Sequence, residues 1–231
     1  ITGTNGKTIT EELISAVLSE GMNVLFTEGN LNNHIGVPLT LLRIRPEHDI
    51  AVIETGANHP GEITLLSNIV QADFGLITNV GRAHLEGFGS FEGVKQTKGE
   101  LYDDLYKRGK QIFLNTSDED LVQMAIGRGF VLGKDALPYI EGVVDAVTPF
   151  VEMKWRPANV QPWRTTTTNL VGSYNIANLC AAVTIGLYFG ITLEQIDHAL
   201  STYYPTNSRS ELRVAGSNRL IIDAYTANPS S

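Results

Sequence analysis

The hydrophobic positions along the chain follow two spacings, one typical of helices and one typical of buried strands. Apolar residues recur every three to four positions over residues 7–20, and Gly21 supplies a stop signal, which predicts an amphipathic helix. Similar helical patterns cover residues 62–70, 91–107, 118–126, 174–188 and 193–203. Short apolar runs typical of buried strands cover residues 23–27, 50–54, 74–80, 111–115 and 219–225, with a weaker run at 129–132.

The order of these patterns predicts the fold class. Strand and helix alternate through the first half of the chain, which indicates a mostly parallel sheet covered by helices on both faces. Residues 139–170 differ, because they form short alternating segments that include four threonines at 165–168. This pattern predicts a small antiparallel sheet. We therefore expect an α/β fold with two unequal sheets.

Composition narrows the range of possible functions. The chain has 231 residues, of which 42% are hydrophobic and 18% charged, so it can bury a core as one large domain or at most two. Lys and Arg number 17 against 25 for Asp and Glu, which argues against a nucleic-acid surface. No apolar run approaches the roughly 20 residues of a membrane span. Cys180 is the single cysteine, which excludes an intrachain disulfide and favours a reducing, cytoplasmic location.

A glycine-rich segment at the start of the chain carries the strongest chemical signal. It joins a strand end to the helix at 7–20, where backbone N–H groups and the helix N-terminus bind phosphate. In this pattern Lys7 reaches the β- and γ-phosphates and the Thr8 hydroxyl binds Mg²⁺. We expect an α/β fold of the phosphate-loop (P-loop) type. The nucleotide-binding residues of the loop are Gly3, Thr4, Asn5, Gly6, Lys7 and Thr8.

Two further polar segments follow predicted strands. Residues 53–62 contain Glu54, and residues 79–90 contain His84. Ligands of open parallel sheets bind beyond the carboxyl ends of the strands, so both side chains are expected to face the phosphate site. The Asn-Lys-x-Asp and Asp-x-x-Gly elements of GTPases do not occur in the sequence.

Together with residues 98–100 and 223–229, these segments resemble the central ATP-binding domain of the Mur ligases, over essentially all 231 residues. Within that family, residues 30–38, 56–62 and 225–229 favour the member that adds D-Ala-D-Ala to UDP-MurNAc-tripeptide. The resemblance implies that ATP phosphorylates a peptide carboxylate, and that an amine then attacks the acyl phosphate. It also implies ATP and Mg²⁺ as cofactors, and UDP-MurNAc-tripeptide and D-Ala-D-Ala as substrates.

The resemblance assigns roles to single residues. Thr8 and Glu54 match ligands of the Mg²⁺ between the β- and γ-phosphates, and His84 matches a ligand of a second Mg²⁺. Lys98 matches a carbamylated lysine, whose neutral amine has taken up CO₂ to become an anionic oxygen ligand for the metal. The expected catalytic residues are Lys7, Glu54, His84 and Lys98. Further ATP contacts are expected at Asn175, Asn178, Arg209 and Asp223, and peptide-substrate contacts at Asn32, Asn33 and His59.

The start of the chain and the domain organisation of the family lead to expectations about the whole protein. At most two residues precede the phosphate loop, so we expect residues 1–231 to be the central domain of a longer enzyme. The family's UDP-sugar domain would then precede this domain and its amine-binding domain would follow. We expect the isolated piece to be a monomer and inactive as a ligase. The alternatives are a ligase that adds diaminopimelate or polyglutamate, or a P-loop ATP-binding module that is not a ligase.

Overall fold

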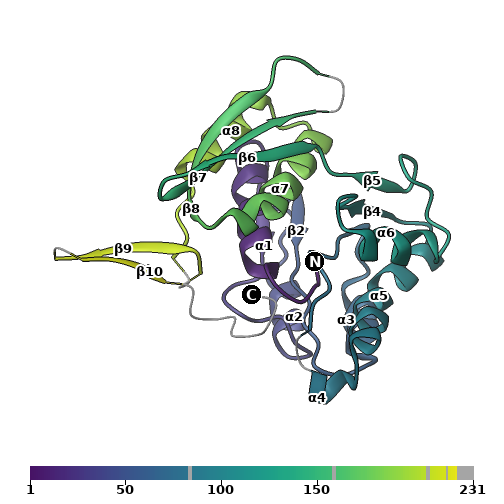
Figure 1. Cartoon of the computed structure of the whole chain (residues 1–231). Coiled ribbons are helices and arrows are strands. Elements are labelled where there is room, and N and C mark those ends of the chain that lie inside the picture. The colour runs from purple at the N-terminus through teal and green to yellow at the C-terminus, as the bar shows by residue number, and fades with distance from the viewer. Residues whose placement is uncertain (83–84, 158–159, 207–208, 217, 223–231) are drawn as a thin grey trace.

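The computed structural model describes residues 1–82, 85–157, 160–206, 209–216 and 218–222 (Figure 1). The helices are α1 (Lys7–Ser19), α2 (Gly36–Leu41), α3 (Glu62–Val70), α4 (Leu85–Phe88), α5 (Phe91–Lys107), α6 (Glu119–Ile126), α7 (Ile176–Tyr188) and α8 (Leu193–Thr202), with a 3₁₀ turn at Ser173–Asn175. The strands are β1 (Val24–Phe26), β2 (Ile50–Val52), β3 (Phe74–Gly75), β4 (Gln111–Leu114), β5 (Ala136–Pro138), β6 (Glu141–Val147), β7 (Phe150–Arg156), β8 (Arg164–Val171), β9 (Glu211–Ala215) and β10 (Asn218–Ile222).

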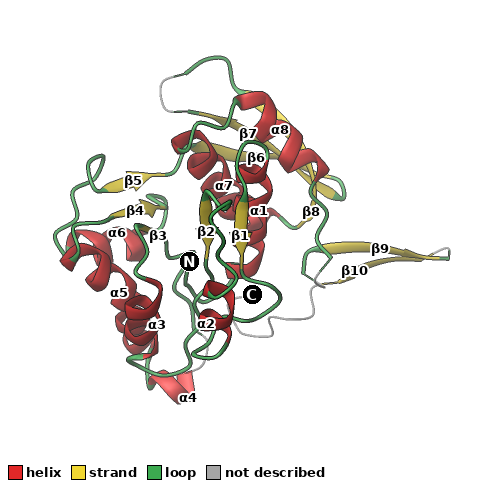
Figure 2. Cartoon of the chain, turned by 180° about the vertical axis from the view of Figure 1, so that it is seen from behind, coloured by secondary structure: helices red, strands yellow, loops and turns green. Residues whose placement is uncertain are grey.

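A parallel sheet runs through the centre of the molecule. β1 pairs with β2, and β4 pairs with both β3 and β5, all in parallel. The first two residues connect these groups: the Thr55 amide donates to the Ile1 carbonyl at 2.7 Å, and the Thr2 amide donates to the Leu76 carbonyl at 3.1 Å. The N-terminus therefore lies between β2 and β3 (Figure 2), in the middle of the predicted parallel sheet.

Helices cover both faces of this sheet, as the alternation of strand and helix predicted. Neighbouring residues of one strand point to opposite faces. Leu76 and Phe113 pack into the core formed with α1, α7 and α8. Ile77 and Ile112 pack into a second core formed with α3, α5 and α6. Figure 1 shows the two helix groups on either side of the strands.

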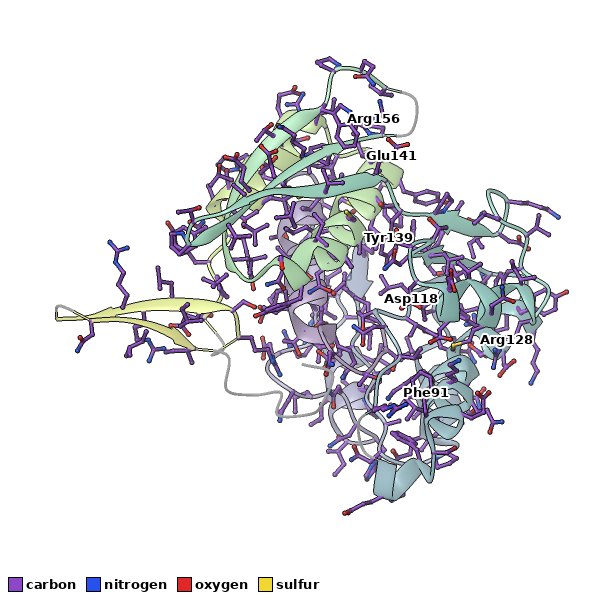
Figure 3. The ribbon with its side chains drawn as sticks, viewed as in Figure 1. Phe91, Asp118, Arg128, Tyr139, Glu141 and Arg156 are labelled. Carbon is purple, nitrogen blue, oxygen red and sulfur yellow. The ribbon has the colours of Figure 1, made fainter. Side chains whose placement is uncertain are left out.

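The small antiparallel sheet is also confirmed. β7 pairs with β6 on one side and β8 on the other, and the sheet lies against α7 and α8. Trp155 is fully buried beneath it, and its indole N–H donates to the Thr166 hydroxyl at 2.9 Å. On the outer edge Arg156 and Glu141 point toward one another (Figure 3), with 2.5 Å between Nε and Oε2.

The weak strand predicted at residues 129–132 is wrong. Gly129 ends a turn after α6, and Leu132 forms only an isolated bridge to Ala136, so the strand beside β4 is β5. The apolar run reflects a buried loop side chain instead, because Phe130 packs into the second core. Ala136 forms the strand because its backbone pairs with Ile112, which a hydrophobic pattern does not reveal.

Short elements account for the other differences. Helices α2 and α4 were not predicted, because each is too short for a helical repeat to show. The strand predicted at 219–225 is one arm of a β9–β10 hairpin, which projects from the body in Figures 1 and 2. Residues 223–225 lie outside the described residues. None of the described helices combines the length and apolarity needed to span a bilayer.

Candidate active site

A cavity of about 880 Å³ opens at the carboxyl ends of the parallel strands. It brings together most residues that the sequence predicted for the site: Gly3, Thr4, Asn5, Gly6, Lys7, Thr8, Asn32, Asn33, Glu54, Lys98, Asn175, Asn178 and Arg209. His59 is not among its lining residues; its side chain is exposed and lies 3.5 Å from Glu62. His84 and Asp223, both predicted for the site, lie outside the described residues.

The phosphate loop depends on two glycines and on the strand beside it. Gly3 and Gly6 have positive φ angles, and a Cβ on Gly3 would lie 2.0 Å from the Thr78 hydroxyl oxygen. Asn79, at the end of the β3 segment, accepts the Asn5 amide at 3.0 Å and donates to the Asn5 carbonyl at 3.0 Å. These contacts hold the loop in its phosphate-binding shape. The position of Asn79 near the end of the strand predicted at 74–80 could have identified it from the sequence.

Lys7 begins α1 and bends back over the loop. Its Nζ donates to the Thr4 carbonyl at 3.3 Å. Burial lowers the pKa of Lys7, and the nearby Arg209 adds to this effect while Glu54 opposes it. The negative charge of Glu54 therefore does not fully offset the loss of hydration of the Lys7 ammonium group, which favours binding of an anion such as a phosphate beside it.

Glu54 is held from three sides at the end of the β2 segment. Its side chain is 1% exposed, the Thr8 hydroxyl donates to Oε2 at 2.7 Å, and the Asn32 amide donates to Oε1 at 2.6 Å. Its backbone amide donates to the Thr27 hydroxyl at 2.9 Å. The Thr8 hydroxyl and the Glu54 carboxylate are oxygen donors at the phosphate loop, so their chemistry fits Mg²⁺.

Lys98 lies on α5 and is only 3% exposed. Its Nζ donates to the Ala57 carbonyl at 3.3 Å and lies 5.4 Å from the Phe88 ring centre. In the part of the chain that the structure describes, it forms no ion pair. Burial lowers the pKa of Lys98 to about 7, and the positive charge of Lys7 is the next cause. About half of the amine is therefore neutral at pH 7.

The asparagines at the start of α7 contact helix α1 just after the phosphate loop, and each other. The Asn178 amide oxygen accepts the Thr10 hydroxyl at 3.0 Å, and its amide nitrogen donates to Asn175 at 3.0 Å. Asn175 donates to the Val171 carbonyl and to the Ser210 hydroxyl, both at 3.0 Å. Both side chains line the cavity, and they also connect α7 to α1 and to the end of β8.

The loop between β2 and α3 is held by two carboxylates. Glu62 accepts the backbone amides of Asn58 and His59 at 2.6 and 3.0 Å. Glu100, on α5, accepts the backbone amides of Gly61 and Thr64 at 2.7 and 2.8 Å, which caps the start of α3. The sequence did not reveal this cap, because the carboxylate comes from a distant helix.

Two cavity residues after β4 were also missed. Asn115 and Asp118 line the cavity beside α6, and Figure 3 shows Asp118 at the start of that helix. The Asp118 carboxylate accepts the Leu121 amide at 3.2 Å as the helix cap. Asn115 is the last residue of the strand predicted at 111–115 and Asp118 lies three positions beyond it, so the strand-end rule that selected Glu54 would also select them.

The chain is similar to known proteins over its whole length. Residues 1–186 match the Mur ligase middle domain. It is 37% identical to the UDP-N-acetylmuramoyl-tripeptide–D-alanyl-D-alanine ligase of Escherichia coli (strain K12), covering 100% of this chain and 52% of that protein. The ligase of the same name from Bacillus subtilis (strain 168) is 36% identical, with coverage of 100% and 50%.

Solved structures of Mur ligases have the same fold as this chain. A crystal structure of MurF from Acinetobacter baumannii superposes with a TM-score of 0.87 at 30% identity, covering 99% of this chain and 51% of that chain. A pseudomurein peptide ligase type C from Methanothermus fervidus, 20% identical with a TM-score of 0.73, shares the fold. The chain thus spans about half the length of the relatives it matches. From its family match and its relatives, the chain belongs to the Mur ligases and carries their middle domain.

Proposed function

We propose that residues 1–231 form the ATP-binding central domain of a cytoplasmic ligase that joins D-Ala-D-Ala to UDP-MurNAc-tripeptide. The UDP-sugar domain and the amine-binding domain would lie in other parts of a longer protein, and the isolated piece would be a monomer without ligase activity. Relatives with this name cover the whole chain, which supports the choice over other Mur ligases. The free and buried Cys180 is compatible with a reducing compartment.

One observation carries the proposal. The Thr8–Glu54 pair and the buried amine of Lys98 line the same cavity as the phosphate loop. Phosphoryl transfer requires positioning and neutralisation of charge more than covalent help from the protein. The phosphate loop and these residues supply oxygen donors, the Lys7 cation and a buried amine at one place, which suits transfer of a γ-phosphoryl group to a carboxylate.

Different residues of the cavity would bind the phosphates and the metal. The loop amides and Lys7 bind the β- and γ-phosphates, and Lys7 stays at the transferred group because its Nζ is anchored to the loop. Thr8 and Glu54 would hold Mg²⁺, which lowers the negative charge between the phosphates. Asn32 keeps one Glu54 oxygen fixed while the other faces Thr8. His84 is proposed as a ligand of a second Mg²⁺.

Lys98 is proposed to carry a carbamate. Its neutral amine attacks the carbon of CO₂, a nitrogen–carbon bond forms as the electron pair of one carbon–oxygen π bond moves onto oxygen, and the nitrogen loses one proton to water. The product is an anionic oxygen ligand that would face the metal site. The lowered pKa of Lys98 supports this step, because only the neutral amine reacts.

The nucleotide and peptide would occupy opposite parts of the cavity. Asn175 and Asn178 are proposed to contact the adenine of ATP, Asp223 its ribose and Arg209 its phosphates. Asn32, Asn33 and His59 are proposed on the peptide side. Asn33 also accepts the amides of residues 35 and 36 at 3.0 and 2.9 Å, so it shapes this wall of the cavity.

The test is an ADP-release assay on the full-length protein with ATP, Mg²⁺, UDP-MurNAc-tripeptide and D-Ala-D-Ala. We expect turnover only when both the peptide and the dipeptide are present. Equal or faster turnover with diaminopimelate or glutamate as the amine would indicate a different Mur ligase. ATP hydrolysis that needs neither substrate would indicate an ATP-binding module that is not a ligase. Residues 1–231 alone should bind Mg²⁺–ATP weakly and form no product.

A further inference from the structure

A ring of hydrogen bonds passes through a buried carboxylate outside the cavity. Glu11 lies on α1, three positions after Thr8, so both side chains are on one face of the helix. Glu11 Oε1 accepts the Thr27 amide at 2.8 Å. The Thr27 hydroxyl accepts the Glu54 amide at 2.9 Å, and Glu54 Oε2 accepts the Thr8 hydroxyl at 2.7 Å. The ring therefore leaves α1 at Glu11 and returns to it at Thr8.

Glu11 has no role in the site as described so far. Its side chain is 0% exposed and does not line the cavity. Its Oε2 has no hydrogen-bond partner among the described residues. Burial raises the pKa of Glu11 to about 8, and the charge of Glu54 is the second cause, so the carboxyl group is mostly neutral at pH 7. Burying such a group costs stability, and an apolar side chain would fill the same space at lower cost.

Thr27 lies between the buried carboxyl group of Glu11 and the backbone of Glu54. β1 ends at Phe26 and β2 ends at Val52, so Thr27 and Glu54 lie just beyond the regular strand pairing. A weak bond of 3.3 Å from the Thr27 amide to the Val52 carbonyl remains there. Glu11 supplies a shorter second acceptor for the same amide and thereby fixes Thr27, whose hydroxyl fixes the Glu54 backbone.

We propose that Glu11 is a positioning residue that holds Glu54 against Thr8 in the arrangement needed to bind Mg²⁺ with the nucleotide. This inference rests on the proposed function, because it takes Thr8 and Glu54 as the magnesium ligands. The competing explanation is that Glu11 only joins α1 to β1. A purely structural link would affect nucleotide binding equally with and without metal, whereas a positioning role affects the metal-dependent part.

The experiment measures ADP affinity of the full-length protein by calorimetry, once with MgCl₂ and once with EDTA. Glu11→Ala should reduce the gain in affinity from Mg²⁺ by about tenfold, or about 1.4 kcal/mol, and leave the affinity in EDTA unchanged. Glu11→Gln should keep the gain, since an amide retains a neutral group with an acceptor oxygen. The matched control is Glu20→Ala, which removes a carboxylate just past α1 that pairs with His198 at 2.8 Å.

A second variant tests the ring itself and covers the case in which Glu11→Ala does not fold. Thr27→Val removes the hydroxyl between Glu11 and Glu54 and should reduce the Mg²⁺ gain to a similar extent. The double variant should lose little more than either single one, because both break the same ring. Equal losses in MgCl₂ and EDTA, or a full gain in Glu11→Ala or Thr27→Val, would overturn the inference alone. A wild-type protein whose ADP affinity does not respond to Mg²⁺ would overturn the proposed function and this inference with it.

Discussion

Lys98 offers the sharpest test of the chemistry, because its environment changes its reactivity by a calculable amount. The amine has an ordinary pKa of 10.5, and burial lowers this to about 7. At pH 7 the neutral fraction therefore rises from about 0.03% to about half, an increase of about 10³-fold. Only the neutral amine reacts with CO₂, so Lys98 should form a carbamate at CO₂ levels where an exposed lysine does not.

The sign of the pH dependence follows. Above pH 7 the amine of Lys98 is mostly neutral, and below pH 7 protonation lowers the fraction of neutral amine that can react with CO₂. At a fixed CO₂ pressure, occupancy of the carbamate should therefore fall as the pH drops through 7. Ligase activity of the full-length protein should fall with it, and removal of CO₂ and bicarbonate at neutral pH should have the same effect until bicarbonate is restored.

The assay is ¹³C NMR of the full-length protein equilibrated with ¹³C-labelled bicarbonate, which reports a carbamate carbon directly. The signal should vanish in Lys98→Arg, which cannot be carbamylated, and ligase activity should be lost in Lys98→Arg and Lys98→Ala. Lys95 is the matched control on the same helix, because Asp120 lies 2.5 Å away and raises its pKa. Lys95→Ala should keep the signal. Persistence of the signal, or full activity, in Lys98→Arg would refute the reasoning.

Three further predictions follow from the same contacts. Lys7→Ala and Glu54→Gln should each lower ligase turnover by about 10³-fold with an unchanged circular dichroism spectrum, since each removes charge stabilisation during phosphoryl transfer; near-normal ADP release would contradict the assigned role. Between pH 4.5 and about 8, the free energy of unfolding of the wild type should fall by about 1.4 kcal/mol per pH unit relative to that of Glu11→Gln, because folded Glu11 keeps a proton that the unfolded chain loses. Urea titrations at several pH values measure this difference, and a difference that does not change with pH would show that the pKa of Glu11 is ordinary. Glu100→Ala removes the cap of α3 and should lower the free energy of unfolding by about 1 kcal/mol, while Glu100→Gln should lose less; equal stability of wild type and Glu100→Ala in urea would rule out the cap.

The long elements were predictable because burial repeats along them. Helix α5 was predicted with the same bounds that the structure gives, and the three strands of the small sheet fall within or next to the predicted stretch. Strand β5 was not predictable in this way, since Ala136 becomes a strand residue by pairing with β4 and not by its own pattern. Pairing between segments distant in sequence leaves no local signal in a single chain.

The candidate site shows the same division. The phosphate loop and Glu54 follow from local rules, a glycine-rich turn before a helix and a polar residue after a strand. The neighbours that define their chemistry come from elsewhere: Asn32 reaches Glu54 from a loop 22 positions away, and Glu100 reaches Gly61 from 39 positions away. Composition alone makes Lys98 an ordinary lysine of a helix face, and it differs from Lys95 only in the folded structure, by its burial and by the ion pair of Lys95 with Asp120.

The buried charges connect stability to function in this domain. Glu11, Glu54 and Lys98 are each at most 3% exposed, and each costs folding free energy that apolar side chains would not. The positive charge of Lys7 also lowers the pKa of Lys98, while burial lowers the pKa of Lys7 itself. Phosphates beside Lys7 and a carbamate on Lys98 would remove both problems at once. Under the proposed function, the site would be complete only when nucleotide, metal and CO₂ are bound, and this role would explain why ionisable residues stand in the core although their burial lowers the stability of the fold.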